Sequence, residues 1–139
     1  MNTIITIETT VRADMDAVWN LWNAPEHIEQ WMHASEDWEC TAAVNDVRVG
    51  GRFVFTLAAK DKSVSFDLPG IYTEVVPNKF LAYTLDDERT VSVSFIEIDN
   101  GVHISETFEA EQVNSEEMQR GGWQAILDNF KKYAENQQA

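Results

Sequence analysis

Residues 118–133 read MQRGGWQAILDNFKKY and carry the long helical pattern of this chain. Apolar residues and one glycine recur there at intervals of three and four, which places them on one face of a helix: Met118, Gly122, Trp123, Ile126, Leu127, Phe130 and Tyr133. Asn114, followed by Glu117 three positions later, predicts a capping box with Asn114 as the N-cap. An apolar stripe of this length has to be covered by another apolar layer.

The residues between Trp38 and Ala110 supply that layer. Turn residues such as Asn45-Asp46, Gly50-Gly51 and Asn100-Gly101 divide this region into short segments. Apolar residues alternate within the segments: Phe53, Phe55 and Leu57; Val64, Phe66 and Leu68; Leu81, Tyr83 and Leu85; Val91, Val93 and Phe95; Val102, Ile104 and Phe108. The pattern predicts an antiparallel meander that buries one face and exposes the other.

The first third of the chain predicts a strand and two short helices. Residues 3–11 are rich in Ile and Thr and read as a strand. Asp14 can cap a helix over the next apolar positions, and Pro25 suits the first turn of a second helix. The prediction is an α+β fold, a single domain over residues 1–139, with a curved antiparallel sheet wrapped around a C-terminal helix.

Composition excludes several classes of protein. The chain has 139 residues and a formal net charge of −14, and 44% of its residues are hydrophobic, which is too apolar for a disordered acidic tail. A polyanion repels phosphate groups, so we expect no nucleic-acid partner and no membrane partner. A lone cysteine, Cys40, and an N-terminus without the features of a signal peptide predict a cytoplasmic protein.

Three segments together resemble one known family. They are Pro25–Trp31 (PEHIEQW), Asp46–Phe53 (DVRVGGRF) and Gly121–Phe130 (GGWQAILDNF). In this order and spacing they are similar to the activator of heat-shock-protein-90 ATPase homologue-like branch of the START-like (SRPBCC, helix-grip) superfamily, in its bacterial single-domain form. The resemblance implies about seven strands that grip the long helix, with an elongated apolar cavity between them. The superfamily includes lipid carriers, hormone receptors and polyketide cyclases, and the length leaves no room for the extra N-terminal domain of the co-chaperone.

The candidate ligand-binding residues are those that this arrangement would turn toward the cavity. They are Trp31, Trp38, Phe53, Phe55, Phe66, Tyr72, Tyr83, Phe95, Glu106, Phe108, Met118, Gly122, Trp123 and Ile126. Core packing alone is the alternative explanation for most of the aromatic residues. Gly121 and Gly122 either let the helix pass close to a neighbour or open volume at the end of the cavity.

Glu106 is the polar residue that breaks an apolar face, because Ile104 and Phe108 share its parity. If its strand is regular, its carboxyl group faces the cavity and its pKa is raised by desolvation. A bulge that turns it to solvent, or an arginine partner, is the alternative. An inward Glu106 could orient a ligand hydroxyl or act as a general base, and it is the only catalytic candidate.

The sequence contains no pattern for a metal or a cofactor. His27, His33, His103 and Cys40 lack metal-ligand spacing, and no phosphate-binding or dinucleotide-binding glycine motif is present. We expect a monomer or weak homodimer that binds a small hydrophobic or aromatic molecule without catalysing a reaction. The alternatives are a polyketide cyclase or aromatase that uses Glu106 with Tyr72 or Tyr83, and a chaperone-accessory interaction module.

Overall fold

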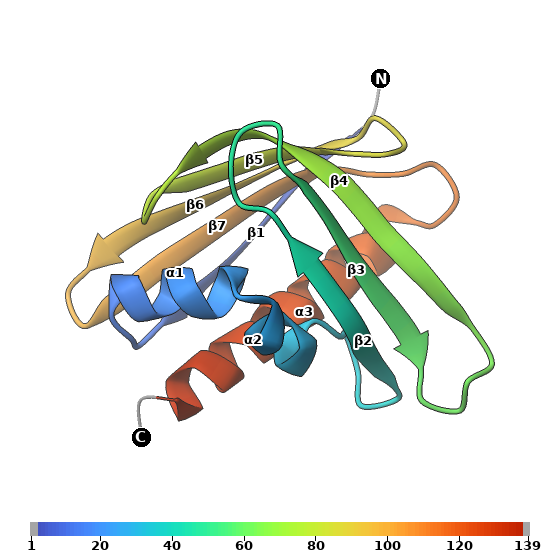
Figure 1. Cartoon of the computed structure of the whole chain (residues 1–139), viewed down its shortest axis with the longest axis horizontal. Coiled ribbons are helices and arrows are strands. Elements are labelled where there is room, and N and C mark those ends of the chain that lie inside the picture. The colour runs from blue at the N-terminus through green and yellow to red at the C-terminus, as the bar shows by residue number, and fades with distance from the viewer. Residues whose placement is uncertain (1–2, 138–139) are drawn as a thin grey trace.

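A curled sheet of seven antiparallel strands forms the larger layer of the structure (Figure 1), a computed structural model that describes residues 3–137. The strands are β1 (Ile4–Val11), β2 (Trp38–Asn45), β3 (Arg52–Ala59), β4 (Ser65–Val76), β5 (Phe80–Leu85), β6 (Thr90–Ile98) and β7 (Gly101–Glu109). Their order in the sheet is β1-β7-β6-β5-β4-β3-β2, so β1 and β2 form the two edges. Irregularities in β2 between Cys40 and Ala42, and in β4 between Tyr72 and Glu74, add local bends.

Three helices complete the fold and confirm the predicted helix-grip architecture. α1 (Met15–Asn23) and α2 (Pro25–Trp31) lie between β1 and β2 in the chain, and α3 (Glu116–Asn136) is the long C-terminal helix. The ends of the predicted domain, residues 1–2 and 138–139, lie outside the described residues. Over residues 3–137, no helix has both the length and the apolar character needed to cross a membrane.

The apolar face of α3 packs against the concave side of the sheet. Leu127, Phe130 and Ala134 are at most 1% exposed. The Phe130 ring lies 4.9 Å from the ring of Trp22 and 4.8 Å from that of Trp31, so α3 also joins the two short helices. Each large apolar side chain buried in this way contributes about 1.5–3 kcal/mol to the stability of the fold.

Polar side chains of α3 cover the exposed edge of β1. Arg120 Nη1 donates to the carbonyl oxygen of Thr6 at 2.9 Å, Gln124 Nε2 to that of Glu8 at 3.2 Å, and Lys131 Nζ to that of Thr10 at 2.7 Å. These carbonyls belong to alternate residues and point away from β7, so they have no strand partner. α3 thereby satisfies the edge and fixes its own position along β1.

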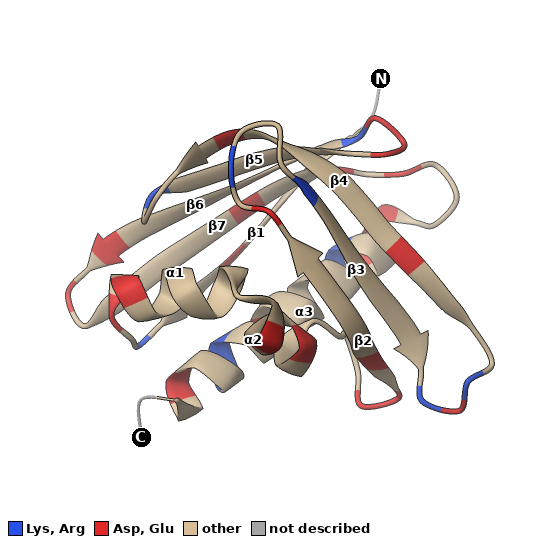
Figure 2. Ribbon diagram, viewed as in Figure 1, with Lys and Arg blue, Asp and Glu red and all other residues tan. Residues whose placement is uncertain are grey.

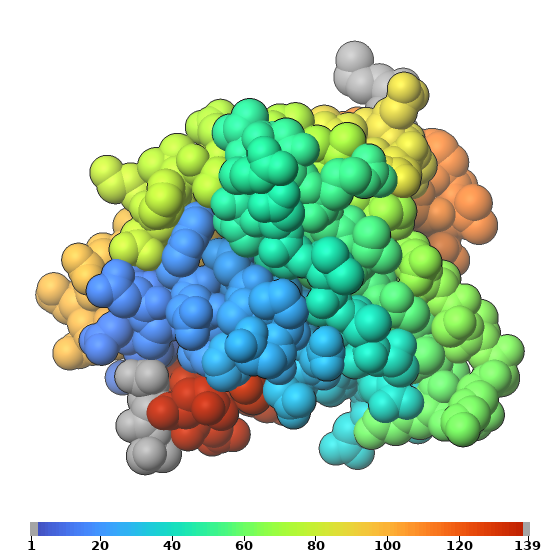
Figure 3. Space-filling model, viewed as in Figure 1, coloured from blue at the N-terminus to red at the C-terminus, as the bar shows by residue number. Residues whose placement is uncertain are grey.

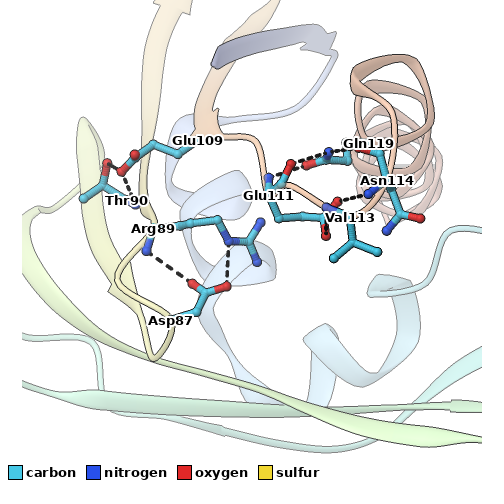
Figure 4. A network of polar contacts seen from close by, with 8 residues as sticks. All are labelled: Asp87, Arg89, Thr90, Glu109, Glu111, Val113, Asn114 and Gln119. Carbon is cyan, nitrogen blue, oxygen red and sulfur yellow. Dashed lines mark hydrogen bonds and ion pairs between the residues drawn. The ribbon is translucent and has the colours of Figure 1, made fainter. Parts of the chain in front are cut away.

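The start of α3 differs from the predicted capping box by one residue. Ser115 is the N-cap, and its hydroxyl oxygen accepts a hydrogen bond from the backbone N–H of Met118 at 3.1 Å. Asn114 is occupied differently: its N–H donates to Glu111 Oε1 at 2.7 Å and its carbonyl accepts from Gln119 Nε2 at 2.8 Å (Figure 4). The buried Gln119 also bonds both backbone groups of Glu111, which fixes the loop before α3.

Charged residues lie mainly outside the core. Figure 2 shows Asp and Glu spread over loops, short helices and strands, with fewer Lys and Arg among them. In the space-filling view, residues of α1 and α2 (blue) close the face between β2 (teal) and the end of α3 (red) (Figure 3). Glu106 is the only buried Asp, Glu, Lys or Arg in residues 3–137.

The paired glycines of α3 are not sites of close approach. A Cβ atom added at Gly121 or at Gly122 would meet no atom of another element within 4 Å. Gly70 on β4 is the opposite case, because a Cβ there would collide with the ring of Phe53 on β3. Glycine is therefore required by packing at Gly70 and not at the two helix positions.

Alanine substitutions distinguish these two environments. Gly121→Ala and Gly122→Ala should each raise the free energy of unfolding by about 1 kcal/mol, because alanine is the better helix former. Gly70→Ala should lower it by about 1–3 kcal/mol through overpacking. Urea unfolding of the three variants measures both effects, and a destabilised Gly122→Ala would contradict the open space described here.

Candidate functional site

A cavity of about 70 Å³ lies between the sheet and α3. Its lining is almost entirely aromatic or aliphatic and comes from all three helices, the residue after α2, and strands of the sheet. It comprises Trp22, Trp31, Met32, Asn45, Phe53, Phe55, Leu68, Tyr72, Tyr83, Glu106, Trp123, Ile126 and Leu127. The space holds about five water molecules, so it accepts a small molecule directly and a larger one only if the lining moves. Met32, a half-buried side chain with three rotatable bonds, is the most adaptable part of the lining.

Aromatic rings from three neighbouring strands form the sheet side of the cavity. Phe53 and Phe55 share one face of β3, with ring centroids 4.9 Å apart. Tyr72 and Tyr83 are directly paired across β4 and β5, with ring centroids 5.9 Å apart, and the Phe53 ring contacts both. The Phe53 ring fits in this layer because its partner on β4 is Gly70, where a Cβ atom would collide with the ring. Strand alternation therefore places four rings in one layer.

Three tryptophans, Trp22, Trp31 and Trp123, lie on the helix side, and contacts outside the cavity hold the last two. Trp31, at the end of α2, donates from Nε1 to the carbonyl oxygen of Leu21 at 2.9 Å, and its own carbonyl accepts from Asn129 of α3 at 2.8 Å. Trp123 of α3 stacks on Phe108 of β7, with ring centroids 3.9 Å apart and an interplanar angle of 8°. Both indoles are therefore held by contacts outside the cavity.

Asn45 and Tyr72, two residues of the lining, are joined by a hydrogen bond. The Tyr72 hydroxyl donates to Asn45 Oδ1 at 2.6 Å, and Asn45 Nδ2 donates to the carbonyl oxygen of Asn23 at 2.8 Å. Burial raises the pKa of Tyr72, so its hydroxyl stays protonated. Asn45 thereby ties the end of β2 to the end of α1, and this contact uses one of the two Nδ2 hydrogens.

Glu106 faces the cavity from β7. Its strand pairs without a bulge on both sides, with Ile7 of β1 and Val93 of β6 as direct partners. The residue is 6% exposed, and no group in residues 3–137 forms a hydrogen bond or ion pair with its carboxyl. Desolvation by burial raises its pKa to about 8, so the carboxyl is mostly protonated at neutral pH. The inward orientation holds, and neither a bulge nor an arginine partner occurs.

Tyr83 brings a second hydroxyl to the same lining. Burial, with the nearby Glu106 and Tyr72 as further causes, raises its pKa well above the ordinary value of 10.0. In the described part of the chain its hydroxyl has no hydrogen-bond partner. A phenol and a carboxylic acid, both protonated and both unpaired, therefore face one apolar space.

The cavity lining includes only some of the predicted ligand-binding residues. Those that line it are Trp31, Phe53, Phe55, Tyr72, Tyr83, Glu106, Trp123 and Ile126. Those that do not are Trp38, Phe66, Phe95, Phe108, Met118 and Gly122. The strand residues of the second group lie at other levels of the sheet, and its two helix residues, Met118 and Gly122, border open space.

Phe66, Trp38 and Met118 lie away from the cavity for reasons of position. Phe66 and Trp38 lie beyond the part of the sheet that α3 covers, and Met118 lies in α3 before the helix reaches the sheet. Phe66 is 48% exposed and its ring contacts Trp38, 5.8 Å away between centroids, near the far end of β4. Met118 is 66% exposed in the first turn of α3. Their positions correct the prediction that they border the cavity.

Phe95, Phe108 and Gly122 lie outside the cavity lining for other reasons. Phe95 is buried against Trp19 and Trp22, and Phe108 is covered by the stacked ring of Trp123, so both belong to the core. Gly122 borders open space that is separate from the cavity lining.

Five lining residues were absent from the sequence prediction: Trp22, Met32, Asn45, Leu68 and Leu127. Trp22 and Leu127 lie on the apolar stripes of their helices, and Leu68 alternates with Phe66, so those signals were present. Asn45 is a residue type that is common in turns. Its hydrogen bonds form only because the fold brings the ends of β2 and α1 together.

Other parts of the structure offer less to a ligand. No group of three His, Cys, Asp or Glu side chains within residues 3–137 could hold a metal ion. Burial raises the pKa of Cys40 to about 11, so its thiol is a poor nucleophile at neutral pH. A larger hollow of about 840 Å³, bordered by Asp16, Asn78 and Glu97, is an open surface depression.

Comparison with known proteins identifies the family. The sequence profile described as "Activator of Hsp90 ATPase homolog 1-like protein" matches residues 12–135. The chain belongs to this family. The match confirms the resemblance drawn from the three sequence segments. A search of curated proteins finds no match.

Solved structures agree with this assignment. The solution structure of an AHSA1-like protein from Aeromonas hydrophila is 42% identical, with a TM-score of 0.92, over 98% of this chain and 94% of that one. Chr148 from Cytophaga hutchinsonii is 46% identical, with a TM-score of 0.82, over 96% and 93% of the two chains. Protein CV1439 from Chromobacterium violaceum, at 22% identity, has a TM-score of 0.86 over 96% and 98% and shows the fold alone. The family and fold support a ligand-binding domain in general.

The raised pKa of Glu106 predicts a pH-dependent stability. Between the ordinary pKa of 4.5 and about 8, the folded protein keeps a proton that the unfolded chain has released. Ionisation of Glu106 therefore leaves the free energy of unfolding unaffected at low pH. It lowers this free energy as the pH rises from 4.5 toward 8, by up to about 1.4 kcal/mol per pH unit.

Glu106→Gln isolates this effect, because the amide keeps the shape of the acid and does not titrate. In urea unfolding, the stability of the wild type relative to Glu106→Gln should fall by a few kcal/mol between pH 5 and pH 8. A difference that stays constant over this range would mean that Glu106 ionises normally.

Proposed function

We propose that the protein binds a small hydrophobic or aromatic molecule in the cavity between the sheet and α3. The observation that carries the proposal is the lining itself, in which aromatic and aliphatic side chains surround a space large enough for several atoms. Removal of a ligand's apolar surface from water supplies the driving force, at about 25 cal/mol per Å². The fixed positions of Trp31 and Trp123 keep the space from collapsing, which lowers the cost of binding.

The size of the cavity limits the first ligand to test. At about 70 Å³ it is smaller than the roughly 300 Å³ at the lower end of drug-sized sites. Compounds with a single ring are the best match to a cavity of this volume. Larger compounds require movement of Met32 or of α3, and should bind more slowly.

A direct test uses benzene, toluene and indole as probes in an NMR titration of the labelled protein. Binding should shift the resonances of Trp31, Tyr83 and Trp123 and raise the melting temperature. Ile126→Phe fills the cavity and should weaken binding by about tenfold or more. Met118→Phe makes a similar addition at an exposed position of the same helix and should leave binding unchanged. Probes that bind Ile126→Phe as well as the wild type, or that shift only surface residues, would contradict the proposal.

A cyclase-type or aromatase-type reaction is the second candidate function. It is favoured by one observation, that Glu106 and Tyr83 face the same apolar space. With a pKa of about 8, Glu106 would donate a proton at neutral pH more readily than remove one. Incubation with a poly-β-keto thioester, followed by mass spectrometry, tests for loss of water. Glu106→Gln should lower that rate by about 10²-fold, and equal rates for both proteins would exclude the assignment.

A further inference from the structure

Four residues of the lining carry side-chain oxygen atoms: Asn45, Tyr72, Tyr83 and Glu106. Asn45 uses its amide N–H on Asn23 and its oxygen on Tyr72, and Tyr72 uses its O–H on Asn45. Glu106 and Tyr83 form no hydrogen bond within residues 3–137. Within residues 3–137, the carboxylic acid of Glu106 and the hydroxyl of Tyr83 are therefore unpaired, as are the second Nδ2 hydrogen of Asn45 and the indole N–H groups of Trp22 and Trp123.

No positive charge is available to Glu106 inside the cavity. Among residues 3–137, no Lys, Arg or His contributes to the lining. The strand neighbours of Glu106 are Ile7 on β1 and Val93 on β6, α3 contributes uncharged side chains, and the titratable groups that face it are Tyr83 on β5 and Tyr72 on β4. Apolar surroundings without a counter-charge favour the neutral acid, which is a hydrogen-bond donor.

We propose that the ligand is an uncharged apolar molecule with a carbonyl oxygen, and that this oxygen accepts hydrogen bonds from the Glu106 carboxylic acid and the Tyr83 hydroxyl. The inference rests on the proposed function and adds the chemical class of the ligand. A neutral carboxylic acid beside a tyrosine hydroxyl in an apolar site is a known arrangement for holding a ligand oxygen. Since both donors are unpaired without a ligand, a carbonyl gains hydrogen bonds that a hydrocarbon of the same shape cannot form.

Three probes of matched shape separate the possible ligand classes: cyclohexanone, methylenecyclohexane and cyclohexylamine. NMR titration at pH 6 should show cyclohexanone binding about tenfold more tightly than methylenecyclohexane at the cavity residues. In the wild type this preference should decline above pH 8, because a carboxylate cannot donate. Cyclohexylamine should bind least tightly at pH 6.

Two variants assign the effect to the two residues. Glu106→Gln keeps a donor that does not titrate, so the preference for cyclohexanone should persist from pH 6 to pH 9. Glu106→Leu should reduce the preference to the part that the Tyr83 hydroxyl supplies, while methylenecyclohexane still binds. Tyr83→Phe should reduce the affinity for cyclohexanone about fivefold and leave methylenecyclohexane unchanged.

Each contrary result has a distinct meaning. Equal affinities for cyclohexanone and methylenecyclohexane would overturn the carbonyl assignment and leave the proposed function in place. Cyclohexylamine binding tightest, with Glu106→Gln abolishing its binding, would overturn it in favour of an ammonium ligand paired with a carboxylate. No shift at Trp31, Tyr83 or Trp123 with any probe would overturn both proposals.

Discussion

The packing of α3 into the concave side of the sheet is the interaction on which the rest of the structure depends. Arg120, Gln124 and Lys131 hold the helix along β1, where they satisfy alternate carbonyls of that edge. On the other side Phe130 contacts Trp22 of α1 and Trp31 of α2. Because the helix is fixed near one edge, the space toward β3, β4 and β5 is filled by large rings, which leave a cavity between them.

The distribution of polar groups follows from the same arrangement. The net charge of −14 is carried almost wholly by residues in contact with solvent, and Glu106 alone among the described charged residues is buried. A group of this kind destabilises the fold at alkaline pH and adds no hydrogen bond to it. A leucine at this position would pack without either cost, so the fold alone does not account for Glu106. The proposed binding of a ligand would give the residue a role.

The fold could be predicted from the sequence because its strands and helices have different periods. Alternation in residues 53–57 and 91–95, and three- and four-residue spacing in 118–133, gave the correct layers. The same parity placed Glu106 toward the helix, since β7 is regular along its length. Alternation predicts the face of the strand on which a residue lies but not its position along the strand. It therefore does not separate Phe66 and Phe95 from Phe53, which lines the cavity. Asn45 could not be found, because its partners are distant in sequence.

The central claim is that the fold keeps a neutral carboxylic acid in an apolar cavity beneath α3. The most direct measurement is the titration of the Glu106 side-chain carboxyl by carbon-13 NMR, in protein labelled on glutamate and assigned with Glu106→Gln. The account predicts a midpoint near pH 8, far above those of the exposed glutamates. A midpoint near the ordinary value of 4.5 would show that the carboxyl is solvated and would contradict the account.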